Sequence, residues 1–109
     1  AFEAAGIGNP VIMTGWGGQL DYLGTDHPGL VDYAMVPVRD CFGSGSYQTH
    51  QHWAQADRDH AVALMRAIVA NPSAFKASAA ATHARIRAEF SESAVIHRFA
   101  EAIDVTRTA

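Results

Sequence analysis

The second half of the chain carries apolar residues three and four positions apart, the spacing of one face of a helix. Asp57, Asn71 and Ser91 stand where three such helices would begin, and Pro72 suits a first helical position because its missing N–H costs nothing there. The pattern predicts three consecutive helices. Their expected buried faces are Ala61, Leu64, Met65, Ile68 and Val69 in the first, Phe75, Ala79, Thr82, Ile86 and Phe90 in the second, and Val95, Phe99, Ala102 and Ile103 in the third.

The beginning of the chain has short apolar runs separated by glycine and proline. Residues 1–6 ("AFEAAG") have the character of the last turns of a helix, and without an initiator Met or a capping residue they indicate a piece of a longer chain. Asn9-Pro10 forces an extended entry into residues 11–14 ("VIMT"). The lack of polar alternation in that run predicts a short parallel strand covered on both faces.

The middle of the chain alternates turn formers with two more short elements. Residues 15–23 predict a glycine loop passing into a short helix, and residues 33–38 a second strand in which Pro37 favours an edge or an end. Residues 39–55, interrupted by glycine and serine, predict a loop. The expected fold class is α/β: a partial Rossmann-like domain with short parallel strands packed against helices and a helical C-terminal part. Two strands are too few for an independent sheet, so further sheet is expected from upstream residues or from another copy.

Composition narrows the classes of function. The net charge of −3, with 8 basic and 11 acidic residues scattered along the chain, provides no basic face for nucleic acid or an anionic membrane. Cys41 is the only cysteine, so no disulfide can form within the chain, and a reducing, cytoplasmic location is expected. No apolar run approaches the length of a transmembrane helix.

Several residues invite a chemical role but have plainer explanations. The loop "TGWGG", residues 14–18, follows the first predicted strand, where ligands collect in open α/β sheets, yet its glycines could equally serve a tight turn. Its spacing is not that of a dinucleotide fingerprint. His50 and His52, with His60 nearby, invite a metal hypothesis, but an H-x-H pair in a loop with no adjacent carboxylate or thiolate is a weak signal, so no metal site is predicted. Trp16 and Trp53 could stack on a ligand, although large aromatic residues more often serve packing. Lastly, "GSGS" at 43–46 lacks the context of a nucleophile elbow.

The order of these segments resembles the C-terminal, donor-binding domain of retaining nucleotide-sugar glycosyltransferases with two Rossmann-like domains, the large family that includes sucrose and mannosyl transferases. That family's motif runs E-A-x-A-x-G-x-P-V-I-A-T-x-x-G-G. The resemblance spans nearly the whole chain, with Gly6 and Asn9 departing from the usual residues. The positions in register are Glu3, Gly8, Pro10, Val11, Ile12, Thr14, Gly17 and Gly18.

The resemblance implies a hexosyltransferase that moves a sugar from a nucleotide diphosphate sugar to an unknown acceptor with retention, without a cofactor or bound metal. It implies that Glu3 binds the ribose hydroxyls of the donor. The other substrate-binding residues would be Thr14, Gly15, Gly17 and Gly18. Residues 1–109 would be the C-terminal portion of the donor-binding domain, inactive alone, since the upstream half of that domain, its catalytic groups and the acceptor domain would precede Ala1.

Two alternatives stay open. The chain could be a noncatalytic interaction module that associates with itself through an exposed sheet edge. It could also belong to another Rossmann-like sugar-nucleotide enzyme, such as an epimerase.

Overall fold

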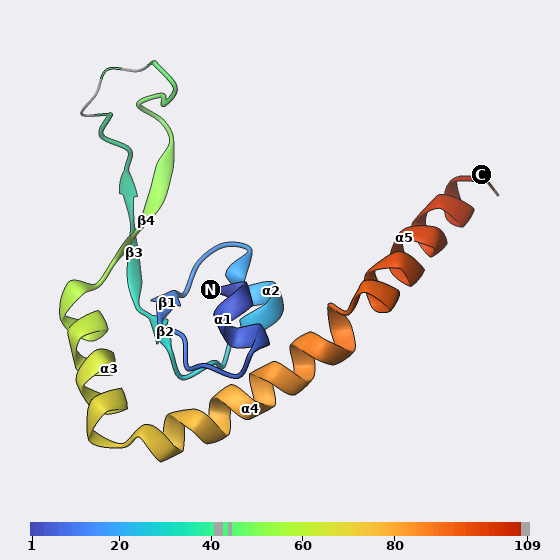
Figure 1. Cartoon of the computed structure of the whole chain (residues 1–109). Coiled ribbons are helices and arrows are strands. Elements are labelled where there is room, and N and C mark those ends of the chain that lie inside the picture. The colour runs from blue at the N-terminus through green and yellow to red at the C-terminus, as the bar shows by residue number, and fades with distance from the viewer. Residues whose placement is uncertain (41–42, 44, 108–109) are drawn as a thin grey trace.

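A computed structural model describes residues 1–40, 43 and 45–107 of the chain. The molecule is open and thin, 49 × 45 × 20 Å, with a hairpin and a long helix projecting from a small centre (Figure 1). Its radius of gyration is 17.8 Å, whereas a compact domain of this length has about 13 Å. The described elements are α1 (Phe2–Gly6), β1 (Met13–Thr14), α2 (Gln19–Leu23), β2 (Leu30–Val31), β3 (Tyr33–Pro37), β4 (His52–Ala56), α3 (Arg58–Ala70), α4 (Pro72–Glu89) and α5 (Glu92–Arg107).

The centre consists of α1, α2, β1 and β2 packed on one side of α4 (Figure 1). The ring of Phe2 lies edge-on to Tyr22 of α2, with centroids 5.2 Å apart, and to Phe90 after α4, at 5.9 Å. These contacts fix α1 against both neighbouring helices, because edge-to-face aromatic pairs are favourable at this range. The buried core is small: Ala5, Val11, Leu23 and Ile86 form one connected cluster, and Val31 and Ala79 are also buried.

Two separate sheets of two strands each replace the single parallel sheet that the sequence predicts. β1 pairs in parallel with β2, with Met13 opposite Leu30 and Thr14 opposite Val31. The expected strand at 11–14 is thus confirmed over its last two residues, and its parallel pairing is confirmed. Its partner β2 was not predicted, since two strand residues between Gly29 and Asp32 are too few to show a period.

The second predicted strand is confirmed as β3, with Pro37 at its end, but its expected parallel pairing is wrong. β3 forms an antiparallel hairpin with β4, in which Val36 lies opposite Trp53. β4 lies largely inside the stretch predicted to be loop. Its sequence "HWAQA" has no β-branched residue, so the strand depends on pairing with β3. Cys41 lies outside the described residues.

The three C-terminal helices and their caps are confirmed. Asp57 accepts a hydrogen bond from the N–H of His60 at 3.0 Å, Asn71 from that of Ala74 at 3.4 Å, and Ser91 from that of Ala94 at 3.3 Å. Each cap satisfies an N–H group that has no partner inside its helix.

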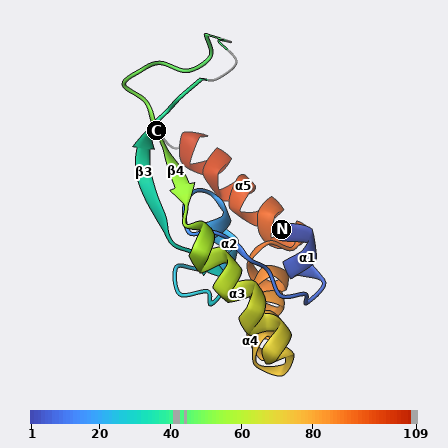
Figure 2. The same cartoon turned by 90° about the vertical axis from the view of Figure 1, so that its left-hand side faces the viewer.

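The predicted buried faces are confirmed only where another element covers them. In α4 the face is correct: Ala79, Thr82 and Ile86 are buried, and Phe75 is half-buried. In α3 the prediction is partly wrong, because Met65 and Val69 are exposed. In α5 it is wrong, because the helix continues past the end of α4 and extends away from the centre (Figure 1); Figure 2 shows the same helix after a 90° turn, where it overlaps the centre in projection. The predicted residues of α5, Val95, Phe99, Ala102 and Ile103, are all exposed. None of the described helices is long and apolar enough to cross a membrane.

Candidate functional site

A cavity of about 280 Å³ lies at the carboxyl ends of β1 and β2. Gly15, the first residue after β1, lines it together with Asp32 and Tyr33, the first residues after β2. Parallel strands bring their carboxyl ends to the same edge of a sheet, and ligands of open α/β sheets bind outside that edge. Of the predicted loop at 14–18, Gly15 lines this cavity, whereas Thr14, Gly17 and Gly18 do not.

The three glycines of the loop differ in what the fold demands of them. A Cβ at Gly15 would lie 3.3 Å from the carbonyl oxygen of Val31, so close strand packing favours glycine there. Gly17 has a φ of +97°, a backbone conformation that only glycine adopts readily. Gly18 has a φ of −62°, and an added Cβ would meet nothing within 4 Å. Packing and backbone geometry explain Gly15 and Gly17, but not Gly18.

Neighbouring side chains hold the loop in place. The side-chain amide of Gln19 donates to the carbonyl oxygen of Thr14 at 2.8 Å, which closes the loop across its base. Within the loop, the ring centroid of Trp16 lies 5.4 Å from that of Tyr33, and both side chains are exposed. In the described part of the chain, the N–H groups of Gly17 and Gly18 have no acceptor. The loop thus offers backbone donors beside an aromatic wall.

Sequence reasoning missed Asp32 at this edge, and it considered His60 only as a possible metal ligand. His60, in the first turn of α3, places Nδ1 3.0 Å from the N–H of Asp32 and 3.2 Å from Oδ2 of the same residue. The neutral ring accepts the amide hydrogen at Nδ1, and a protonated ring would instead donate from that atom to the carboxylate. No local signal joins the two residues, because they are 28 positions apart.

Glu3 lies in the first turn of α1, and its side chain is exposed. Its helix is linked to β1 through α2, since Phe2 packs on Tyr22 and the Tyr22 hydroxyl donates to the sulfur of Met13 at 3.6 Å. The contacts of the described residues do not join the Glu3 side chain to the loop. Its assignment to the ribose therefore stays a prediction.

The remaining candidates do not assemble into a second site. Among the described residues no three His, Cys, Asp or Glu side chains lie close enough together to hold a metal ion. His50 lies just before β4 and His52 is the first residue of β4, and both are exposed, whereas His60 is on α3. Trp53, on β4, is exposed and packs edge-on to Tyr47 at 6.0 Å. Lys76 lies within α4, as the sequence predicts.

The edge of the parallel pair is equipped for binding rather than for covalent chemistry. It offers backbone N–H groups, the Asp32 carboxylate and aromatic surface, which suit a polar ligand with a ring. No protein-family model, curated protein or solved structure matches the chain. The interpretation of the site consequently rests on its own geometry and on the motif in the sequence.

Proposed function

We propose that the chain forms part of the donor-binding domain of a cytoplasmic, retaining nucleotide-sugar glycosyltransferase. In this proposal the domain is Rossmann-like, and the donor lies outside the carboxyl ends of β1 and β2, against the loop at 14–18. The supporting observations are the spacing of Glu3 from the glycine pair, the parallel pairing of β1 with β2, and the cavity bordered by Gly15.

Gly18 is the observation that carries the proposal. It matches the motif in register, yet its φ of −62° and the open space around it would accommodate any L side chain. A residue without a side chain at such a position is accounted for if a ligand approaches the backbone closely. The unpaired N–H groups beside it would donate to the diphosphate.

Glu3 has the chemistry required for the ribose. Two vicinal hydroxyls can each donate to one oxygen of a carboxylate, and hydrogen bonds to a charged group contribute about 1.5 to 3 kcal/mol. The exposed side chain is available for this contact. In this proposal Glu3 contributes to donor affinity, and the groups that act on the sugar are supplied by other parts of the enzyme.

The test is a calorimetric titration of the chain with uridine and guanosine diphosphates. We expect one of them to bind saturably and Glu3→Gln to weaken it roughly 10- to 100-fold. Glu92→Gln is the matched control, because Glu92 is likewise an exposed acidic residue in the first turn of a helix. It should bind like the unchanged chain.

Gly18→Ala is the second variant, since its methyl group would occupy the ligand's position without disturbing the fold. We expect it to weaken binding at least as much as Glu3→Gln does. Failure of both diphosphates to bind the chain would contradict the proposal. If a diphosphate binds and both variants leave its affinity unchanged, its binding site is not at this edge.

The exposed face of α5 favours a second candidate, the self-associating interaction module. Phe99 is 68% exposed, and Val95, Ile96 and Ile103 are also exposed on the same helix. Sedimentation velocity over a range of concentrations would show a dimer that Phe99→Glu abolishes. A monomer at every concentration would exclude this function.

A further inference from the structure

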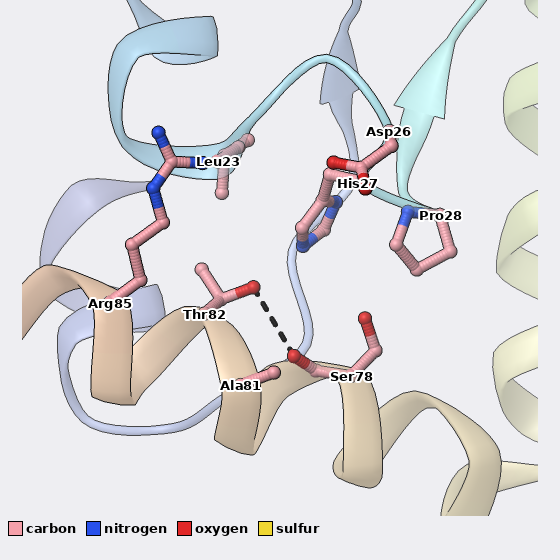
Figure 3. Close-up of a pocket in the computed structure, with 8 residues that line it drawn as sticks. All are labelled: Leu23, Asp26, His27, Pro28, Ser78, Ala81, Thr82 and Arg85. Atoms are coloured by element: carbon pink, nitrogen blue, oxygen red, sulfur yellow. Dashed lines mark hydrogen bonds between the residues drawn. The ribbon is translucent and has the colours of Figure 1, made fainter.

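A second cavity, of about 290 Å³, lies at the opposite end of the parallel pair, between α4 and the loop that leads from α2 to β2 (Figure 3). The loop contributes Asp26, His27 and Pro28, while α4 contributes Ser78, Thr82 and Arg85. No lining residue is shared with the candidate donor site, although Thr25 of the same loop lines the cavity of that site. The two cavities are therefore separate sites.

The walls of this cavity are fixed by contacts to the backbone. The N–H of Gly29 donates to Nδ1 of His27 at 3.0 Å, and the Thr82 hydroxyl donates to the carbonyl oxygen of Ser78 at 3.2 Å. Arg85 donates to the carbonyl oxygen of Asp21 at 3.1 Å. Its guanidinium lies over Gly24, where a Cβ would come within 2.6 Å of Nη1. The site is thus formed by the fold before any ligand is present.

The hydrogen bond to Gly29 decides which nitrogen of His27 carries the proton. Because Nδ1 accepts, the proton of the neutral ring is on Nε2. The imidazole hangs from the loop toward Ser78 and Thr82 of α4 (Figure 3). Burial lowers the pKa of His27 below its usual 6.5, although Asp26 acts to raise it, so the ring is neutral at pH 7. His27 therefore presents an N–H donor to the cavity.

The lining of this cavity contains both hydrogen-bond donors and acceptors, and its positive and negative charges balance. Arg85 is the cation of the lining and Asp26 the anion, and Glu89 pairs with Arg85 from outside the cavity at 3.4 Å. The Ser78 hydroxyl and the lone pairs of Thr82 complete the polar set, while Leu23 and Pro28 add an apolar floor. This balance disfavours a phosphate or an ammonium ion and suits a neutral molecule with several hydroxyl groups.

We propose that the cavity between the His27 loop and α4 binds a neutral polyol the size of one sugar ring. The volume of about 290 Å³ is at the lower end for ligand pockets and suits a small ligand. Asp26 accepts from a pair of hydroxyl groups, His27 and Arg85 donate to ring substituents, and Ser78 does either. This site is independent of the proposed donor site and makes no use of Glu3 or Gly18.

The experiment is an NMR titration of the chain with glucose, mannose and myo-inositol, following the imidazole signals of His27 and the amide signals of Ser78 and Thr82. We expect saturable, millimolar binding of at least one of them. Asp26→Asn should weaken it roughly 10-fold or more, because a charged acceptor is lost. Ser78→Ala should weaken it by a smaller factor.

Asp21→Asn is the control, since Asp21 is an exposed carboxylate of α2 that does not line the cavity, and its carbonyl oxygen accepts from Arg85 while its side chain does not. It should leave the affinity unchanged. No saturable shift up to about 100 mM, or equal affinity in Asp26→Asn, would overturn the proposal. Tighter binding of glucose 6-phosphate than of glucose would also overturn it, in favour of an anion site. The diphosphate titration tests the variants of Glu3 and Gly18, so its outcome is independent of the outcome of this sugar titration.

Discussion

The centre of the molecule and its two arms, the β3–β4 hairpin and α5, contain similar patterns of apolar residues. Only the centre buries these residues. On α4, Ile86 is 5% exposed because α1 and α2 pack over it, whereas Phe99 of α5 is 68% exposed. The hairpin of β3 and β4 likewise exposes Tyr33, Met35 and Trp53. Regular spacing shows that a helix or strand has an apolar face, and packing decides whether that face is covered.

The largest expected effect is on the free energy of unfolding, when a buried side chain of α4 is truncated instead of an exposed one of α5. Ile86→Ala removes buried methyl and methylene groups from the core, and we expect it to destabilise the fold by about 2 to 3 kcal/mol. Phe99→Ala removes a larger side chain that is already in water, so its effect should stay within about 0.5 kcal/mol. Urea unfolding followed by circular dichroism measures both. If Phe99→Ala cost as much as Ile86→Ala, α5 would be packed in solution against a surface that this structure lacks.

The helices could be predicted from sequence because their signals are local. Asp57, Asn71 and Ser91 each cap a helix through an N–H three residues away, and the apolar spacing within each helix is visible over a few turns. The pairing of the strands could not be predicted in the same way. β3 and β4 are fourteen residues apart in the sequence, and β2 contains only two residues.

The same difference between local and distant signals applies to the candidate site. The loop at 14–18 was predicted because it follows a strand directly in sequence. The contact of Asp32 with His60 and the cavity between His27 and α4 arise from segments far apart in the chain. No pattern in the sequence singles out His27, since the hydrogen bond that fixes its tautomer depends on the turn at Gly29.

In the centre, Gly29 in front of β2 lies very close to the backbone of Val11 in front of β1. A Cβ at Gly29 would lie 1.9 Å from the carbonyl oxygen of Val11, so the backbone must shift in Gly29→Ala. The shift would weaken the bond from the N–H of Met13 to the carbonyl oxygen of Gly29, now 3.0 Å. We expect a loss of about 1 to 3 kcal/mol in urea unfolding.

Gly18→Ala is the matched control for Gly29→Ala, because its added Cβ meets nothing within 4 Å and its φ of −62° suits alanine. Its stability should differ by less than about 0.5 kcal/mol from that of the unchanged chain. Equal loss in both variants would show that the glycine loop, like the centre, is tightly packed. That result would also remove the argument for a ligand at Gly18.

A smaller effect concerns the junction between the hairpin and the centre. Asp57 caps α3 through its side chain, and its N–H donates to the carbonyl oxygen of Asp32 at 2.7 Å. Asp57→Ala should cost about 1 kcal/mol, because only the cap is lost. Asp57→Asn keeps a capping oxygen and should cost much less. Hydrogen exchange of the first α3 amides measures the difference, and full protection in the alanine variant would contradict it.

The smallest effect is the pH dependence that His27 gives to the centre. Burial lowers the pKa of His27 in the folded state below 6.5, with Asp26 opposing the shift and Arg85 lying across the same cavity. Between the lowered pKa and 6.5 the unfolded chain binds more protons than the folded chain, so stability rises with pH in that window. The stabilisation is complete above 6.5 and is lost as the pH falls toward the folded-state pKa. Urea midpoints at about pH 7.5 and about pH 5.5 should differ in the unchanged chain, and His27→Gln should reduce that difference. His97→Gln, on the exposed α5, should preserve it; if it removed the difference instead, the titrating group would belong to an arm and not to the centre.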